Sequence, residues 1–199
     1  MKKIGHLLAL LAVVLCLSAS AAWARPTVVI DAGHGGHDRG GVPGDRYAEK
    51  IYTLDVALRL QARLNSMGYR TVMTRRGDSF VSLNDRCSIA NSQGNAIFVS
   101  IHFNSAPREG ANGIETYYYS RRSGSLAAAV HRSVVSAMGT EDRHVRARGF
   151  YVIRNTRVPA ILVECGFLTN RSEGRLIAGS GAYRQRLADA IARGIRSRY

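Results

Sequence analysis

The chain has 199 residues, which is enough for one domain with a single core and too few for two comfortable domains. No repeat, low-complexity tract or Pro/Gly/Ser linker interrupts it, so the sequence shows no sign of a repeat protein or of separate linked modules. The 28 basic and 14 acidic residues give a net charge of +14. Such a charge favours contact with a polyanion, and the alternative is that the basic side chains simply form a solvated surface.

The first 24 residues have the pattern of a secretory signal peptide. Two lysines precede an apolar run at 7–17, and small residues around Ala24 predict cleavage after it. The apolar run is shorter than the ~20 residues that span a bilayer, so a membrane anchor is the less favoured alternative. Cleavage would leave an exported domain of residues 25–199, periplasmic or extracellular, with no membrane span. For such a protein, cell-wall polymers or anionic lipids are nearer partners than nucleic acid, for which no reader motif is present.

The next part of the chain alternates strand and helix patterns. A β-branched run at 27–31 predicts a strand, and the glycine-rich loop at 33–44 lets the backbone approach a ligand closely. Apolar residues at helical spacing predict a helix over 49–67, ended by Gly68. A strand at 69–74 is expected to follow.

A second helix and a buried strand come next. Ser82 and Asp85 form a capping box that predicts a helix to about residue 93. The near-continuous apolar run at 96–101 is typical of a strand that is buried on both faces. The remaining predicted elements are strands at 113–119, 150–153 and 160–164 and helices at 126–138 and 183–198. This order predicts a single α/β domain, with about six strands in a mostly parallel or mixed sheet and helices on both faces.

Two cysteines lie beyond Ala24. Cys87 falls in a predicted helix and Cys165 at the end of a predicted strand. An oxidising compartment would permit a disulfide, but nothing in the sequence brings the two together. We therefore expect two packed thiols.

Three predicted strands end in side chains that can bind a metal. Asp31 and His34 close the first strand, His102 follows the run at 96–101, and Glu164 ends a later strand. The carboxyl ends of parallel strands meet at one rim of a sheet, where ligands gather. Two histidines and a carboxylate suit a catalytic zinc site with a position left open for water. Glu164 could then serve as a base and pass its proton to a leaving amine.

Each of these residues also has a structural alternative. His34 could be a turn residue, and His102 a buried histidine with its hydrogen bonds satisfied. Glu49 begins the first predicted helix, where the helix dipole alone favours an acid. Glu164 could pair with an arginine such as Arg154. Spacing alone leaves these alternatives open.

Several segments, in order and rough spacing, resemble the zinc-dependent N-acetylmuramoyl-L-alanine amidases of the type 3 amidase family. They are VIDAGHGG at 29–36, Glu49-Lys50, Thr74-Arg75, VSIHFN at 99–104, and LVECGF at 162–167 with Thr169-Asn170. The likeness extends from about Pro26 to the final helix. Each segment alone is a weak signal, and the full series is highly specific.

The resemblance implies a ligand set and a reaction. His34, Glu49 and His102 would hold one Zn²⁺ per chain, and Glu164 would be the catalytic carboxylate. The family cuts the amide between the lactyl group of N-acetylmuramic acid and the L-alanine of the stem peptide in peptidoglycan. In that scheme zinc polarises the lactyl carbonyl and water, while Glu164 takes a proton from the water and returns it to the departing nitrogen.

Other polar residues could surround this site. Asn104, Arg75 and Arg154 could contact substrate, although each has a ready role in a turn or an ion pair. His37 and Asp38 could orient His34, or could belong to a solvated loop.

The chain departs from the family pattern at Arg39, Gly41 and Phe103, where relatives carry proline, alanine and a small residue. None of these is a proposed ligand, so they bear on substrate detail. Some relatives carry a regulatory helix that blocks the zinc. Residues 120–150 are long enough for one ordinary helix only, so we expect a site that is not self-blocked.

Two other functions remain open. The chain could be a zinc peptidase or deacetylase of cell-wall material, or a non-catalytic protein that binds wall polymers through its basic face. Loss of any of the four site residues would favour the binding protein, and all four are present. A monomer is expected, and a protein activator remains possible.

Overall fold

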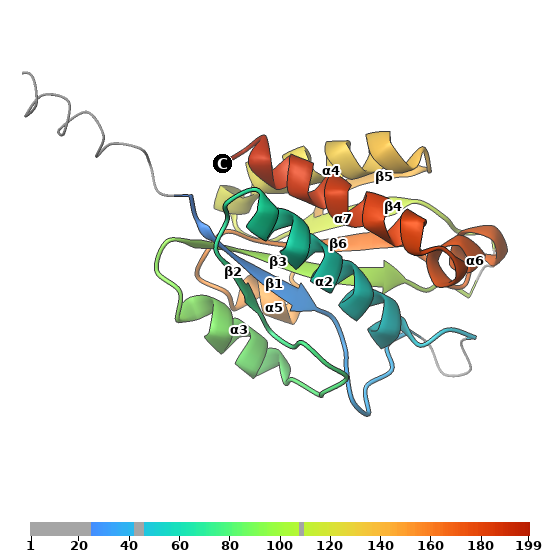
Figure 1. Cartoon of the computed structure of the whole chain (residues 1–199), viewed down its shortest axis with the longest axis horizontal. Helices are drawn as coiled ribbons and strands as arrows, with labels where there is room; N and C mark the ends of the chain where they lie inside the picture. The colour runs from blue at the N-terminus through green and yellow to red at the C-terminus, as the bar shows by residue number, and fades with distance from the viewer. Residues whose placement is uncertain (1–24, 42–45, 108–109) are drawn as a thin grey trace, which may run out of the picture.

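The computed structural model describes residues 25–41, 46–107 and 110–199. A six-stranded sheet forms the middle of this part of the chain (Figure 1). Its strands, in spatial order, are β2 (Thr71–Met73), β1 (Thr27–Ala32), β3 (Ala96–Asn104), β6 (Ala160–Phe167), β4 (Ile114–Tyr118) and β5 (Asp142–Ala147). Neighbouring strands run parallel except for β6 and β4. The predicted sheet, mostly parallel and of mixed direction, is confirmed.

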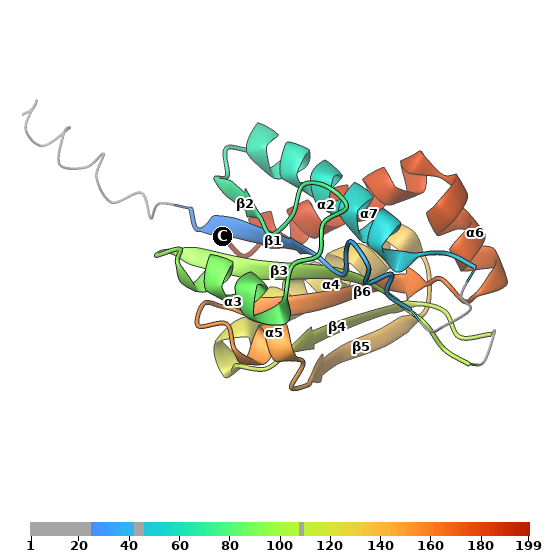
Figure 2. The ribbon, with the colours of Figure 1, turned by 90° about the horizontal axis from the view of Figure 1, so that it is seen from below.

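Helices cover both faces of this sheet, as the sequence predicts (Figure 2). One face carries α2 (Glu49–Ser66), α4 (Gly124–Met138) and α7 (Gly181–Arg196), which pack on one another and on the strands. The other face carries α3 (Leu83–Asn91) and the single turn α5 (Tyr151–Arg154). Two short elements, the 3₁₀ turn η2 (Arg121–Ser123) and the helix α6 (Arg171–Gly179), complete the described fold.

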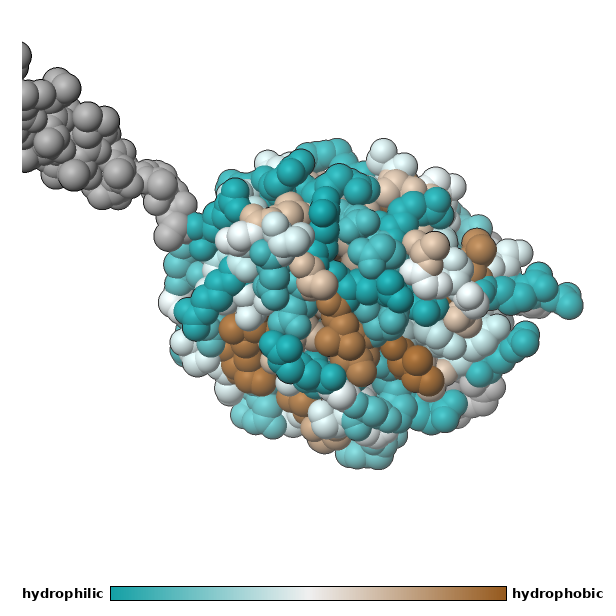
Figure 3. Space-filling view, in the orientation of Figure 1, coloured by the Kyte–Doolittle hydropathy of each residue, from teal (hydrophilic) through white to brown (hydrophobic). Residues whose placement is uncertain are grey.

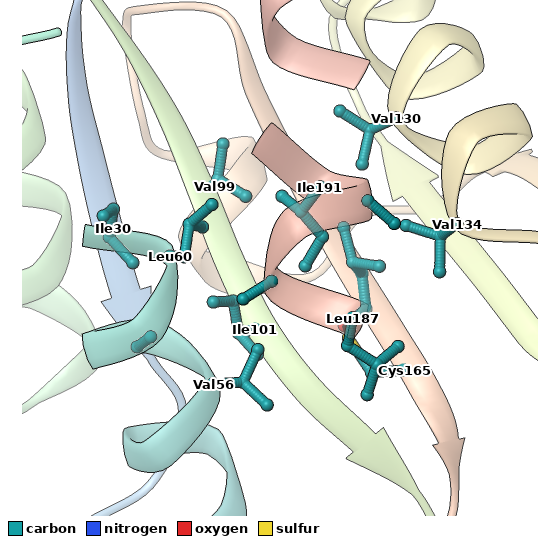
Figure 4. Close-up of a cluster of buried hydrophobic side chains, with 14 of the residues drawn as sticks. Ile30, Val56, Leu60, Val99, Ile101, Val130, Val134, Cys165, Leu187 and Ile191 are labelled. Atoms are coloured by element: carbon teal, nitrogen blue, oxygen red, sulfur yellow. Dashed lines mark hydrogen bonds between the residues drawn. The ribbon is translucent and has the colours of Figure 1, made fainter. Parts of the chain in front are cut away.

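The larger hydrophobic core lies between the sheet and the first of these helical layers. Figure 4 shows Ile30, Val99 and Ile101 from the strands meeting Leu60 of α2 and Ile191 of α7. All five side chains are fully buried. Their removal from water is the main favourable contribution to folding, at roughly 1.5–3 kcal/mol for each large apolar side chain.

A smaller core fills the other face, beneath α3 and α5. It contains Cys87 with Phe98 and Leu162, whereas Cys165 belongs to the larger core. Both cysteines are free and buried, so the expectation of two packed thiols is confirmed.

The face of the molecule that carries α2 and α7 is largely hydrophilic (Figure 3). Most of the hydrophobic side chains visible on this face lie in the lower half of the view.

The predicted capping box at the start of α3 is also present. The Ser82 hydroxyl accepts a hydrogen bond from the amide of Asp85 at 3.1 Å and donates one to its carboxylate at 2.7 Å. The cap satisfies an amide that the first turn of a helix leaves without an intrahelical partner. It therefore fixes where α3 begins.

The strand predicted at 150–153 is wrong, because these residues begin the helical turn α5. Val152 and Ile153 satisfy their apolar character by packing in the smaller core from a helical backbone. The true strand is β5 at the sheet edge, where four of its six side chains are exposed. Polar residues are tolerated at such an edge, so β5 lacks the apolar pattern of a strand. The helix α6 also lacks a counterpart among the predicted elements.

Asp31 ties several elements together at the carboxyl end of β1. This fully buried carboxylate accepts hydrogen bonds from Arg86 at 2.6 Å, Ser100 at 2.6 Å and Thr74 at 2.8 Å. The donors come from α3, from β3 and from the residue after β2. Removal of one member of a buried ion pair leaves the other charge without compensation in a poorly solvated place.

Asp31→Ala is therefore expected to lower the free energy of unfolding by about 3–5 kcal/mol. Urea denaturation followed by circular dichroism measures this change. Asp189→Ala is the control, because its carboxylate pairs with Arg63 at the surface and its loss should cost no more than about 1 kcal/mol. Equal effects of the two substitutions would contradict a tying role for Asp31.

Candidate active site

Residues from four elements meet at the carboxyl ends of the central strands. His34 lies just after β1, His102 near the end of β3, and Glu164 on β6, where it is the direct cross-strand partner of His102. Glu49 is the first residue of α2, and its carboxylate lies beside both histidines. The structure thus brings together all four residues that the resemblance assigns to the site.

Glu49 lies between the two histidines. One carboxylate oxygen, Oε2, is 3.0 Å from His34 Nε2, and the other, Oε1, is 2.9 Å from His102 Nδ1. One donor atom from each residue lies within 4.8 Å of the others, and the two imidazole rings meet edge to face. Two imidazole nitrogens and a carboxylate oxygen at this spacing fit the ligand set of a catalytic zinc ion.

Further hydrogen bonds fix the direction of these donors. Asp38 Oδ2 lies 2.9 Å from His34 Nδ1, which leaves His34 Nε2 as the nitrogen aimed at the cluster. The amides of Gly41 and Phe103 donate to the two oxygens of Glu49 at 3.0 and 2.9 Å. Of the two alternatives considered for Asp38, this contact favours the orienting role over a solvated loop. His37 lies elsewhere, because its ring packs on Phe80 with centroids 4.2 Å apart.

The glycines around the cluster make room for it. A Cβ atom at Gly33 would lie 2.4–2.8 Å from three atoms of the His102 ring. A Cβ atom at Gly40 would lie 2.6 Å from both Glu49 Oε2 and His34 Cδ2. His34 itself has φ of +61°, a left-handed conformation that few residues other than glycine adopt. The loop is thus shaped around the donor groups.

The electrostatics of Glu49 and His102 reinforce each other. Burial opposes ionisation of Glu49, but hydrogen bonds and positive charge from His102 and His34 lower its pKa. Burial likewise favours neutral His102, yet the hydrogen bond and negative charge of Glu49 raise its pKa. The cluster therefore concentrates positive charge around a carboxylate, and a divalent cation would supply that charge in place of protons.

Glu164 differs from Glu49 in its surroundings. Burial raises its pKa to about 8; positive charge on His102 opposes this shift, and the carboxylates of Glu49 and Glu115 add to it. Its Oε2 is buried and has no hydrogen-bond partner in the described part of the chain. Among the described residues no ion pair joins it to Arg154, the structural alternative considered above. A buried carboxyl without partners is costly unless it acts on a ligand.

The three residues considered for substrate contacts have different positions. Arg75 is buried and donates to the carbonyls of Ala32 at 2.9 Å and of Gly33 at 2.8 Å, contacts that favour its structural alternative over a substrate contact. The amide group of Asn104 donates to Glu115 at 2.7 Å. Arg154 ends α5 and is exposed.

Sequence reasoning missed Glu115, which lies beside Glu164 as its cross-strand partner on β4. This buried acid accepts hydrogen bonds from Asn104 and from the Tyr117 hydroxyl, each at 2.7 Å, and pairs with Arg143 at 3.3 Å. The sequence did contain a signal for Glu115. Side chains two positions apart in a strand share one face of the sheet, so an acid two residues before Tyr117 in a Tyr-rich strand is expected to face the same side as that ring.

Comparison with known proteins connects this geometry to a family. Residues 28–197 match the family model described as N-acetylmuramoyl-L-alanine amidase. The uncharacterized protein YqiI of Bacillus subtilis is 39% identical over all of this chain and 99% of its own length. The N-acetylmuramoyl-L-alanine amidase LytC of the same organism is 37% identical over 87% of this chain, which spans only 35% of LytC.

Solved structures agree with these matches. The catalytic domain of CwlV, an N-acetylmuramoyl-L-alanine amidase from Bacillus (Paenibacillus) polymyxa, superposes with a TM-score of 0.82 at 37% identity, covering 87% of this chain and 97% of that one. The CwlD amidase of Clostridioides difficile, solved in complex with the GerS lipoprotein, has a TM-score of 0.82 at 29% identity, covering 86% and 97%.

Gly33→Ala is expected to weaken zinc binding by about 10–100-fold, because the added methyl group would displace the His102 ring. Competition with a chromophoric chelator measures this affinity. The control is Gly94→Ala, whose methyl group would have no heavy atom within 4 Å. Unchanged zinc affinity in Gly33→Ala would show that His102 is not held against Gly33 when zinc binds.

Proposed function

The chain belongs to the N-acetylmuramoyl-L-alanine amidase family, and on that premise we propose that it hydrolyses the amide between N-acetylmuramic acid and the L-alanine of the peptidoglycan stem peptide. The observation that carries the proposal is the meeting of His34, Glu49 and His102 with Glu164 on the next strand, whose Oε2 has no hydrogen-bond partner among the described residues. Such a set holds a metal and a proton-transfer group side by side.

In this proposal His34, Glu49 and His102 hold one zinc ion. When bound, zinc would act as a Lewis acid toward the lactyl carbonyl and toward water. The chain's own contribution is to fix the donors: Asp38 sets the nitrogen that His34 presents, and two backbone amides hold Glu49. This support keeps the ligand geometry in place before substrate arrives.

Glu164 would carry the proton. Burial raises the pKa of Glu164 and so favours its neutral form, while the positive charge of the donor cluster favours its charged form, and the proposed reaction uses both forms. The charged form can accept a proton from the attacking water, and the neutral form can return it to the alanine nitrogen as the amide breaks. The free Oε2 leaves one oxygen available for this transfer.

The position of α4 supports an open site. The helix α4 packs on α7 and β4, which supports the expectation that residues 120–150 do not block the donor cluster. No helix in the described ranges is long and apolar enough to cross a membrane. The signal peptide proposed for residues 1–24 lies outside the described residues, and we retain it, together with an exported monomeric domain over 25–199, as part of the proposal. The complex of CwlD with GerS makes a protein partner worth testing here.

The reaction is tested by mass spectrometry of the soluble products after the zinc-loaded protein, expressed without residues 1–24, is incubated with peptidoglycan. We expect intact stem peptides with a free L-alanine amino group, and no release when a chelator is present. A cut at another bond would indicate a zinc peptidase or deacetylase. No cut by zinc-loaded protein would favour a wall-binding protein or one that needs an activator.

Glu164→Gln separates metal binding from proton transfer. The variant should retain zinc and lose turnover by about 10²–10⁴-fold, because the donors remain while the proton carrier is gone. His102→Ala should lose both zinc and activity. Metal analysis and product release are measured on the same preparations. Loss of zinc from Glu164→Gln would make Glu164 a ligand rather than the proton carrier.

A further inference from the structure

A cleft of about 480 Å³ opens directly from the donor cluster. His34 and His102 line its inner end. Its two walls come from segments far apart in the sequence, since one contains Phe80, Val81 and Leu83 before and at the start of α3, and the other consists of residues 150–152 at the start of α5. Anything bound in this cleft would therefore touch the site of reaction.

Both walls expose large apolar side chains. Phe80 and Leu83 are 49% and 53% exposed on one wall, and Phe150 and Tyr151 are 43% and 40% exposed on the other. Single exposed apolar residues are ordinary, but four that line one concave surface are typical of a ligand site. Phe150 is held in place by an edge contact with Tyr117, with ring centroids 4.9 Å apart.

The positive charge of the cleft lies at its inner end, at His34 and His102, and its apolar walls offer no cation to an anionic ligand. Its lining contains one arginine, Arg86, which is buried and engaged with Asp31 at 2.6 Å. Asp38 adds a partly exposed carboxylate at the inner end. Outside the donor cluster, the described lining of the cleft therefore offers apolar contact and no free arginine or lysine, and its walls suit a neutral group with apolar faces.

The two halves of the proposed substrate differ in this respect. N-acetylated sugar rings are uncharged and present C–H faces that pack on aromatic rings, whereas the stem peptide carries carboxylates. Resting on the proposed function, we infer that the cleft between Phe80, Leu83, Phe150 and Tyr151 binds the glycan half of the substrate. These residues determine which side of the scissile amide lies over α3 and α5.

The opposite side of the site suits the peptide half. Following the sheet from His102 through Glu164 leads to Glu115 on β4 and then to Arg143 on β5. The Arg143 guanidinium is partly exposed and pairs with Glu115 at 3.3 Å and with Glu141 at 3.2 Å, so a substrate carboxylate would compete with these two acids for it. Glu164 lies between Arg143 and the cleft in the order of the strands. A group that passes a proton to the departing amine is expected to lie at this boundary between the glycan and peptide halves.

The test is competitive inhibition of soluble disaccharide–tripeptide hydrolysis. The two inhibitors are the uncharged N-acetylated disaccharide N,N′-diacetylchitobiose, which carries no lactyl carboxylate, and the glycan-free stem tripeptide. In Phe80→Ala and in Leu83→Ala, the inhibition constant of the disaccharide should rise about tenfold relative to that of the tripeptide, the loss expected for one large apolar contact. Leu176→Ala is the matched control, because Leu176 is 51% exposed on α6, away from the cleft lining.

The outcomes separate the inference from the proposed function. A rise for the tripeptide instead of the disaccharide would place the peptide in the cleft and overturn the inference. The same holds if neither constant changes, or if Leu176→Ala changes the disaccharide constant as much as Leu83→Ala does. A wild-type protein that binds zinc but releases no stem peptide from the disaccharide–tripeptide would instead overturn the proposed function and, with it, the glycan assignment.

Discussion

Two buried guanidinium groups hold the backbone that leads to His34, and the geometry of the site depends on them. Arg86 donates to the carbonyl of Ala32 at 2.7 Å and to that of His34 at 2.8 Å, while Arg75 reaches the carbonyls of Ala32 and Gly33. Asp31 supplies the carboxylate that makes burial of Arg86 tolerable. The left-handed conformation of His34 is strained, and strain persists only where surrounding contacts determine the backbone this firmly.

This arrangement explains why some of the site could be predicted from sequence. Buried parallel strands are apolar along their length, so a polar residue at a strand end is easy to recognise, and His102 and Glu164 are found in this way. Glu49 is different, because an acid at the start of a helix has an ordinary explanation. Only the resemblance to a family singled it out, and its position between the two histidines depends on contacts with residues that are distant in sequence.

The sequence leaves the role of Arg75 open and predicts one strand wrongly, each for a physical reason. Charged residues are seldom buried, which suggests a substrate contact for Arg75, yet its donors are used by backbone carbonyls. Residues 150–153 combine β-branched and aromatic side chains, but their contacts in the smaller core favour a helical turn. In both cases the role of the residue is decided by contacts with residues that are distant in sequence, and a local sequence pattern cannot show these contacts.

The polar edge strand has a consequence of its own. One edge of the sheet is β5, which pairs only with β4 among the described strands, and an edge strand can in general pair with another extended chain. Its exposed positions include Asp142, His144 and Arg146, which would have to lose water if a second strand were added there. The polar residues of β5 therefore have two effects. They remove the apolar pattern by which a strand is recognised in a sequence, and they disfavour aggregation through this edge of the sheet.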